Sequence, residues 1–284
     1  MLVDYHVHSL CSDGVYTVKE VVEMLLRRQV SFFALTDHDT VDGIAEARKL
    51  SRNKINFVSG IEFTCREMQI VPMDKWYSIH LLGYDFDENN VRLLGALHER
   101  KEKVIRIFEN LCKELTAAGY SVSIDKIPIS CGNVLQLCDV AAYIAEIYPN
   151  VPENIFKSIE NYTEKLKNVN ISAEDAVRYI HNAGGRAVWA HPFCVYQDLK
   201  KINIDENEVL DILNILAEIG VDGIEAQYLA FGEEKRTWLR TVAEKRNMIY
   251  TAGSDFHGSA GRDFMGMEAR CVPQWHEIDK NGHT

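Results

Sequence analysis

The chain has 284 residues, of which 46% are hydrophobic, a length and composition that fit a single α/β barrel and exclude a disordered chain. Its net charge of −11 would repel a long polyanion, which argues against extended nucleic acid as a partner but not against short RNA. No apolar run approaches the about 20 residues that span a membrane, and the seven cysteines never stand in CxxC spacing, so we expect a cytoplasmic protein without membrane contact or disulfides.

Strands and helices alternate along most of the chain. The N-terminal part predicts strands at 2–8, 31–36, 55–63 and 79–84 and helices at 18–29 and 41–50, the first opening at a capping box, Thr17-Val-Lys-Glu20. The C-terminal part predicts helices at 172–183, 209–219 and 233–246 and strands at 186–190, 223–228 and 248–252. This alternation is typical of βαβ units around a parallel sheet, so the expected fold class is α/β.

The alternation stops between the strands at 79–84 and 186–190. About 100 residues lie there, where one crossover needs about 30. They begin with a helix at 91–118, in which Val104, Phe108, Leu111 and Leu115 follow helical spacing. We therefore expect a barrel domain at 1–99 and 171–284, interrupted by an inserted, mainly helical subdomain at 100–170.

Side chains that can bind metal stand at the ends of the predicted strands. They are His6 and His8 on the first strand, His38 after the second, Glu62 at the end of the third, His191 after the strand at 186–190, and Asp255 and His257 after the last. His80 is an exception, because it stands at the start of its strand. Barrel enzymes assemble their sites at the carboxyl ends of the strands, so this pattern predicts a metal site there.

Asp13 lies in the turn Ser12-Asp13-Gly14, where an aspartate commonly has a turn-forming role. Thr17 already caps the following helix, which leaves Asp13 available as a ligand. The remaining histidines, on helices or in the tail, are expected to have no part in the site; they are His98, His181, His276 and His283.

Six ordered motifs resemble those of the PHP (polymerase and histidinol phosphatase) family of metal-dependent phosphoesterases. They are DYHVHS, LTDHDT, GIEFT, HLLGY, AHP and GSDFHG, and they span residues 4–258. The resemblance implies a distorted (β/α)7 TIM-like barrel that holds a trinuclear metal site. It also implies a ligand set for each metal: His6, His8, Glu62 and Asp255 for the first; Glu62, as a bridge, with His80 and His191 for the second; Asp13, His38 and His257 for the third.

The insertion resembles that of the subgroup that hydrolyses nucleotide 3′,5′-bisphosphates or trims RNA from its 5′ end. Members of that subgroup usually carry an Arg-Pro-His-type stretch in the insertion. The corresponding residues 137–142, LCDVAA, contain neither the arginine nor the histidine. The metal chemistry is therefore expected to be retained, whereas the resemblance leaves the nucleotide specificity open.

Imidazole and carboxylate ligands suit two to three Mn, Zn or Fe ions. Clustered divalent ions activate water and neutralise phosphoryl oxygens, so we hypothesise attack by a metal-bridging hydroxide. Asp255 is the expected proton acceptor, and His257 or His191 would protonate the leaving group. Arg262 is a candidate phosphate clamp, although a solvated loop charge is an equally good interpretation.

The sequence thus predicts a phosphatase or phosphodiesterase that acts on a small phosphorylated substrate, a nucleotide or nucleotide bisphosphate. Alternatives are a histidinol-phosphate-type phosphatase, a 5′-exoribonuclease and a metal-dependent hydrolase of C–N bonds. The net charge and the missing Arg-Pro-His stretch count against the exoribonuclease. A non-catalytic metal-binding module is a further alternative, and the complete set of ligand residues counts against it.

Overall fold

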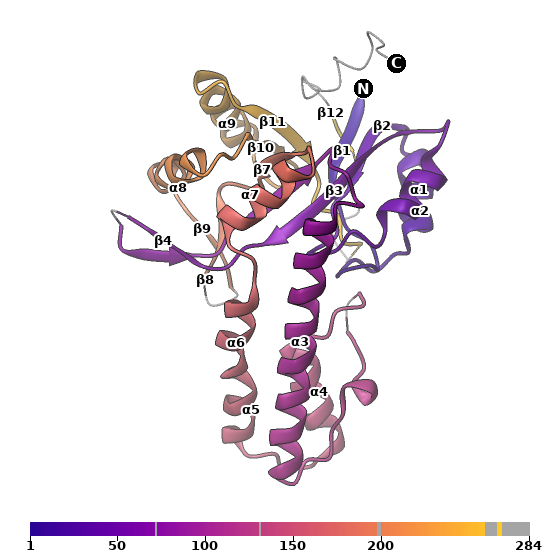
Figure 1. Cartoon of the computed structure of the whole chain (residues 1–284), viewed down its shortest axis with the longest axis vertical. Helices are drawn as coiled ribbons and strands as arrows, with labels where there is room; N and C mark the ends of the chain where they lie inside the picture. Colours follow the sequence, from indigo (N-terminus) through magenta and orange to yellow (C-terminus); the bar gives the residue numbers. More distant parts are fainter. Residues whose placement is uncertain (72, 131, 198–199, 259–265, 269–284) are drawn as a thin grey trace.

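Seven strands form a curved sheet that almost closes on itself (Figure 1). From one edge to the other they are β11 (Ile249–Gly253), β10 (Gly223–Tyr228), β7 (Arg186–Trp189), β6 (His80–Tyr84), β3 (Asn56–Thr64), β2 (Val30–Leu35) and β1 (Leu2–Val7). A bridge between Val7 and Phe256 brings the end of β1 beside the residues that follow β11. The computed structural model describes residues 1–71, 73–130, 132–197, 200–258 and 266–268, and these confirm the α/β barrel.

The strand directions are not all parallel. β6 runs antiparallel to both of its neighbours, β3 and β7, and β12 (Met267–Glu268) pairs antiparallel with the outer edge of β1. The prediction of a parallel sheet was therefore wrong at these strands. The reversal accounts for His80, because the start of an antiparallel strand lies at the same end of the barrel as the carboxyl ends of the parallel strands.

Helices cover the outside of this sheet (Figure 1). They are α1 (Val18–Arg27), α2 (Ile44–Ser51), α7 (Ala173–Asn182), α8 (Glu206–Glu218) and α9 (Glu233–Lys245). The predicted capping box is present at α1, where Thr17 and Glu20 bond to each other's main-chain N–H groups. Strands β6 and β10 are buried at every residue, as expected for strands between a helical layer and the barrel interior.

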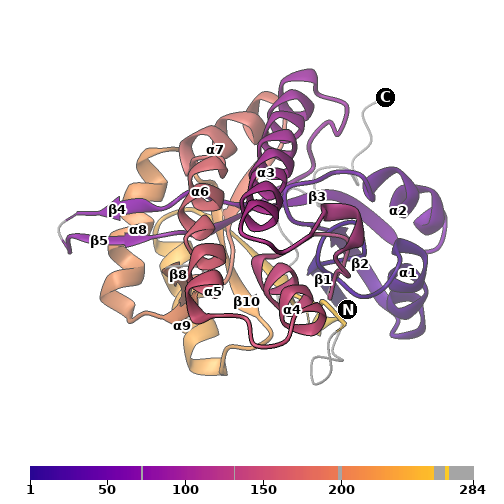
Figure 2. The same cartoon turned by 90° about the horizontal axis from the view of Figure 1, so that it is seen from below.

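The segment between β6 and α7 projects from one end of the barrel (Figure 1), and Figure 2 shows it from below, in front of the barrel. It contains α3 (Val91–Ala117), a short 3₁₀ turn at Ile124–Lys126, α4 (Leu137–Ile147), α5 (Glu153–Glu160) and α6 (Tyr162–Val169). α3 joins two cores: Leu93 and Leu97 pack in the largest cluster of the barrel, whereas Phe108 and Leu111 pack in a separate cluster with α4, α5 and α6. The predicted long helix at 91–118 is confirmed within a residue.

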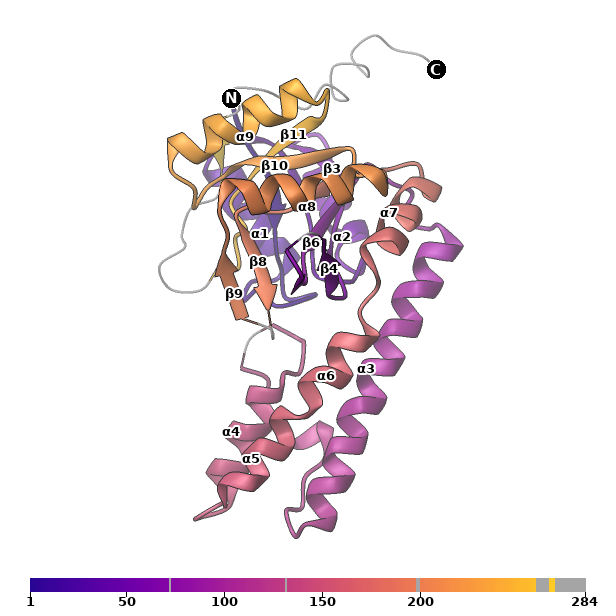
Figure 3. The same cartoon turned by 90° about the vertical axis from the view of Figure 1, so that its left-hand side faces the viewer.

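Two short hairpins lie outside the barrel sheet and were not predicted. One pairs β4 (Met68–Ile70) with β5 (Lys75–Tyr77), and the other pairs β8 (Cys194–Gln197) with β9 (Lys200–Asn203). The second follows the AHP motif and extends from the barrel toward the insertion (Figure 3). Among the described residues, no helix combines the length and apolarity needed to cross a bilayer.

Candidate metal centre

The nine residues predicted as metal ligands come together at one end of the barrel. They are His6 in β1, His8 and Asp13 after it, His38 after β2, Glu62 in β3, His80 at the start of β6, His191 after β7, and Asp255 and His257 after β11. Most are buried, whereas Asp13, His38 and His257 are partly exposed. The structure therefore places residues from both ends of the sequence in one site.

Glu62 lies at the middle of this site, with imidazoles facing both of its carboxylate oxygens. Its Oε2 lies 3.0 Å from Nε2 of His6 and 3.1 Å from Nε2 of His8. Its Oε1 lies 2.9 Å from Nδ1 of His80 and 3.4 Å from Nε2 of His191. A carboxylate with ligand nitrogens on both sides has the arrangement that bridging between two metal ions requires.

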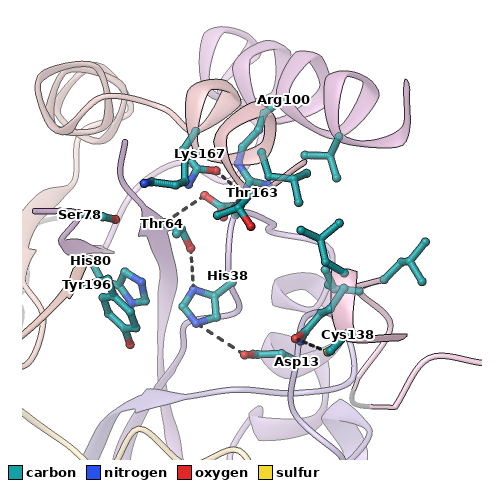
Figure 4. Close-up of a pocket in the computed structure, with 18 of the residues that line it drawn as sticks. Asp13, His38, Thr64, Ser78, His80, Arg100, Cys138, Thr163, Lys167 and Tyr196 are labelled. Carbon is teal, nitrogen blue, oxygen red and sulfur yellow. Dashed lines mark hydrogen bonds and ion pairs between the residues drawn. The ribbon is translucent and has the colours of Figure 1, made fainter. Parts of the chain in front are cut away.

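Asp255 and Asp13 lie on either side of His8, with Asp255 near Nε2 of that ring and Asp13 near Nδ1. Oδ1 of Asp255 lies 3.4 Å from Nε2 of both His6 and His8. Oδ2 of Asp13 lies 3.2 Å from Nε2 of His257. Figure 4 shows the ring of His38 between Asp13 and Thr64, at 3.8 Å from an oxygen of Asp13. The two carboxylates thus extend the array of ligand atoms on either side of His8.

Three groups of potential ligand atoms each lie within 4.8 Å of one another. They are His6, His8, Glu62 and Asp255; His8, Asp13, His38 and His257; and His38, Glu62 and His80. The first is the set predicted for one metal, and the second contains a predicted set together with His8. The third group contains His38, whereas the motifs imply His191 at this metal. His191 nevertheless lies near Oε1 of Glu62, the same oxygen that His80 contacts.

Opposite charges in the site act strongly on one another. Burial alone would raise the pKa of Glu62, but the imidazoles of His6, His38 and His80 hold it well below its usual value. Burial alone would likewise lower the pKa of His8, yet the neighbouring carboxylates raise it to about 10. For His38 burial prevails and lowers the pKa to about 3, which keeps the imidazole neutral and able to coordinate a metal.

Glu225, on β10, is a buried carboxylate behind the site that sequence reasoning did not identify. Its Oε1 lies 2.9 Å from Nδ1 of His6, and its Oε2 accepts a hydrogen bond of 2.8 Å from the main-chain N–H of His191. A carboxylate on the second ring nitrogen fixes the tautomer and orientation of a ligating histidine. The available signal was the one charged residue of a strand that is buried at every position.

The chemistry of the donors fits divalent metal ions. Every atom in the three groups is an imidazole nitrogen or a carboxylate oxygen, a set that suits Mn, Zn or Fe. The ring of His8 is completely buried, and carboxylates face both of its nitrogens: Glu62 and Asp255 at Nε2, and Asp13 at Nδ1. A divalent cation held between such imidazole nitrogens and carboxylate oxygens would compensate their buried negative charge.

A cavity of about 740 Å³ separates the metal centre from the insertion (Figure 4). His38, His80 and His257 line it on the barrel side, and Phe108 and Leu166 line it on the insertion side. Leu137 and Cys138, from the stretch without the Arg-Pro-His motif, also line it. Arg262, the predicted phosphate clamp, lies outside the described residues.

The sequence pattern of the PHP domain matches residues 4–162, which is more than half of the chain. The chain belongs to the PHP domain family. The resemblance drawn from the six motifs is therefore confirmed. Together with the imidazole and carboxylate groups, this membership makes the protein a metal-dependent phosphoric ester hydrolase.

Three curated relatives of this PHP domain protein align along nearly all of it. A phosphoribosyl 1,2-cyclic phosphate 1,2-diphosphodiesterase of Eggerthella lenta is 29% identical, over 92% of this chain and 96% of the relative. A 5′-3′ exoribonuclease of Haemophilus influenzae is 26% identical, over 98% and 93%. A 3′,5′-nucleoside bisphosphate phosphatase of Chromobacterium violaceum is 28% identical, over 98% and 96%.

A solved structure shares the fold of this PHP domain protein. It is described as an amidohydrolase from Chromobacterium violaceum with bound sulfate and superposes with a TM-score of 0.67 at 23% identity. The match covers 98% of this chain and 96% of that one, so the barrel and the insertion are both part of the shared architecture.

Proposed function

We propose that the protein hydrolyses a phosphate ester of a small molecule, with a nucleotide or nucleotide bisphosphate as the substrate class. The observation that carries the proposal is the carboxylate of Glu62, buried between the imidazoles of His6 and His8 on one side and of His80 and His191 on the other. The names of the relatives, a diphosphodiesterase, a bisphosphate phosphatase and an exoribonuclease, support phosphate esters as the substrates.

We assign two to three divalent ions, Mn, Zn or Fe, to the nine side chains. The first ion would be held by His6, His8, Glu62 and Asp255, the second by Glu62, His80 and His191, and the third by Asp13, His38 and His257. Bound there, such ions would supply a water molecule with a lowered pKa and positive charge against the phosphoryl oxygens.

The chain's own residues would orient the substrate and move protons. Asp255 is the proposed proton acceptor, and the hydroxyl of Tyr228 holds its Oδ2 at 2.8 Å. Of the two candidate donors to the leaving group, His257 is the better placed, because it lines the cavity. His191 does not line the cavity, and its side chain is only 1% exposed.

The insertion would bind the organic part of the substrate. Its side of the cavity is formed by apolar side chains that include Val104, Phe108, Leu135 and Leu166. A cavity of about 740 Å³ has room for a nucleotide. We propose residues 100–170 as a substrate-covering subdomain, in which the separate apolar cluster maintains the shape of this wall. A cytoplasmic location is part of the proposal, since the five described cysteines are free.

A substrate panel tests the reaction class. The metal-loaded protein should release phosphate from at least one of a set of nucleotides, nucleotide bisphosphates, sugar phosphates and short 5′-phosphorylated RNAs with added Mn²⁺. A parallel panel of C–N substrates should release no ammonia. Ammonia release without phosphate release would overturn the proposal, whereas cleavage of the RNA alone would favour the exoribonuclease.

A variant pair tests the ligands. Glu62→Gln should lower both the metal content and the rate of phosphate release, the rate by about a thousandfold or more, because it removes the shared anionic ligand. His181→Gln, at a surface histidine paired with Asp222, should change neither quantity. Elemental analysis of the wild type should find two to three equivalents of Mn, Fe or Zn. Full activity in Glu62→Gln would rule out the assigned centre.

A further inference from the structure

The hairpin of β8 and β9 is fixed to the edge of the metal centre. Main-chain hydrogen bonds of 2.8 Å run in both directions between Tyr196 and Ser78, which lies two residues before His80. The ring of Tyr196 stacks on the ring of His80, with centroids 4.3 Å apart and planes at 14° (Figure 4). The hairpin is therefore held in a defined position beside the proposed ligands.

Lys201 shares the face of this hairpin that carries Tyr196. The two residues are directly opposite each other in the antiparallel pair, and the side chains of such a pair lie on the same side. Both line the cavity. Nζ of Lys201 lies 3.4 Å from the hydroxyl of Tyr228 and 3.8 Å from Oδ2 of Asp255, with 31% of the side chain exposed.

In the described part of the chain, the other lysine and arginine side chains that line the cavity are Arg100 and Lys167, and both are engaged in closer ion pairs. Arg100 lies 2.9 Å from a carboxylate oxygen of Asp39. Lys167 lies 2.8 Å from Glu67 and 2.9 Å from Glu164. These carboxylates offset much of their charge toward an incoming anion.

Among the described residues, the carboxylate that pairs with Lys201 is that of Asp255, which belongs to the metal centre. Asp255 is a proposed metal ligand, so its negative charge would be shared with a bound cation. An ammonium group beside divalent ions is repelled unless an anion lies between them. The position of Lys201 is therefore favourable when a phosphoryl group occupies the cavity.

We propose that Lys201 binds a phosphoryl oxygen of the substrate, oriented by the hydroxyl of Tyr228 and by the hairpin that carries Tyr196. The inference rests on the proposed function and makes it more specific. Lys201 would supply a substrate-binding cation from the hairpin that follows the AHP motif. The stretch at 137–142, by contrast, contributes Leu137 and Cys138 to the cavity in place of an arginine and a histidine. An ammonium serves here as a compact charge with rotatable donors.

Lys201→Met tests the proposal, with Lys200→Met as the matched control. Lys200 is adjacent in the same strand, is exposed, is not among the cavity-lining residues and lies on the opposite face of the hairpin. Titration calorimetry of the Mn²⁺-loaded proteins with inorganic phosphate measures binding without turnover. Lys201→Met should weaken phosphate binding by about tenfold or more, as expected for loss of a charge-assisted hydrogen bond. Lys200→Met should bind phosphate within about twofold of the wild type.

Kinetics and metal analysis complete the test. With p-nitrophenyl phosphate, Lys201→Met should lower kcat/KM by about tenfold or more, mostly through KM, and Lys201→Arg should recover part of the loss. All the variants should retain the metal content of the wild type. Unchanged phosphate binding in Lys201→Met would overturn the inference and leave the proposed function intact. Weaker phosphate binding that is fully explained by a loss of metal from Lys201→Met would have the same two consequences. A wild type that binds phosphate but hydrolyses no phosphate ester would instead overturn the proposed function.

Discussion

The carboxylate of Asp4, on β1, accepts hydrogen bonds from the main-chain N–H of Ser254 at 2.9 Å and from its hydroxyl at 2.6 Å. A third donor is the main-chain N–H of Gly266, also at 2.9 Å. Asp4 precedes His6 by two residues, and Ser254 immediately precedes Asp255. This clamp therefore closes the barrel at the place where the first and last strands contribute proposed ligands to the same metal.

Ser254→Ala should destabilise the protein by removing one of these donors. A buried charged group that loses a hydrogen-bond partner costs about 1–3 kcal/mol, and Asp4 is completely buried. Denaturant unfolding of the metal-free protein measures the change. Ser158→Ala is a suitable control, because its hydroxyl bonds only locally, to the carbonyl of Ile155 in α5. Equal stability of the two variants would show that the hydrogen bond from the hydroxyl of Ser254 to Asp4 contributes nothing to the stability of the fold.

Glu225→Gln should weaken metal binding without removing a ligand. With the Nδ1–H of His6 donating a hydrogen bond to the carboxylate of Glu225, Nε2 of that ring is left to coordinate a metal. Loss of such a contact typically costs about 10- to 100-fold in metal affinity. Competition with a chromogenic chelator measures the affinity, and Glu218→Gln, at an exposed position of α8, provides the control. Identical affinities in the two variants would remove the orienting role of Glu225.

Much of the metal centre could be predicted because its residues stand beside strands that local patterns reveal. His6 and His8 follow the two-residue period of β1, and Asp255 follows the short apolar run of β11. The direction of β6 could not be predicted, since antiparallel pairing depends on contacts with β3 and β7 far along the chain. His80 was therefore an exception to the strand-end pattern in the sequence, and its position is explained only by the reversed direction of β6.

The residues that surround the ligands were less predictable. Glu225 is positioned by its contact with His6, 219 residues away in the sequence, and a single charged residue in a strand has no periodic signal. Lys201 reaches the cavity only through the hairpin of β8 and β9, whose strands of four residues each are too short for a clear alternation. Both positions depend on tertiary packing, which local patterns do not encode.

Gly253→Ala should distort the metal centre by displacing the strands that carry its ligands. A Cβ at Gly253 would lie 2.3 Å from Cβ of His6 and 2.5 Å from Oε1 of Glu225, so β1 and β11 would have to separate. Overpacking of this kind costs about 1–3 kcal/mol, and we also expect loss of metal affinity. Gly95→Ala is an informative control, because a Cβ there meets no atom within 4 Å and the residue lies inside α3. That variant should gain about 0.5–1 kcal/mol of stability. If thermal unfolding shows Gly253→Ala as stable as the wild type, the close approach is not a constraint.

Metal binding should release protons, and its affinity should fall as the pH is lowered. In the metal-free protein, burial lowers the pKa of His6 and His8, but the surrounding carboxylates outweigh it and raise the pKa of His6 well above its usual value and that of His8 to about 10. The imidazole of His8 therefore carries a proton at pH 6–8, below its pKa, and a metal that binds this ring must displace the proton.

Each proton displaced makes the apparent affinity fall by about tenfold for each unit by which the pH is lowered. Calorimetric titration of the metal-free protein with Mn²⁺, in two buffers of different ionisation enthalpy, counts the protons released. We expect at least one for the first equivalent of metal. Equal heats in the two buffers, together with an affinity that does not change between pH 6 and 8, would show that His6 and His8 are already neutral before the metal binds.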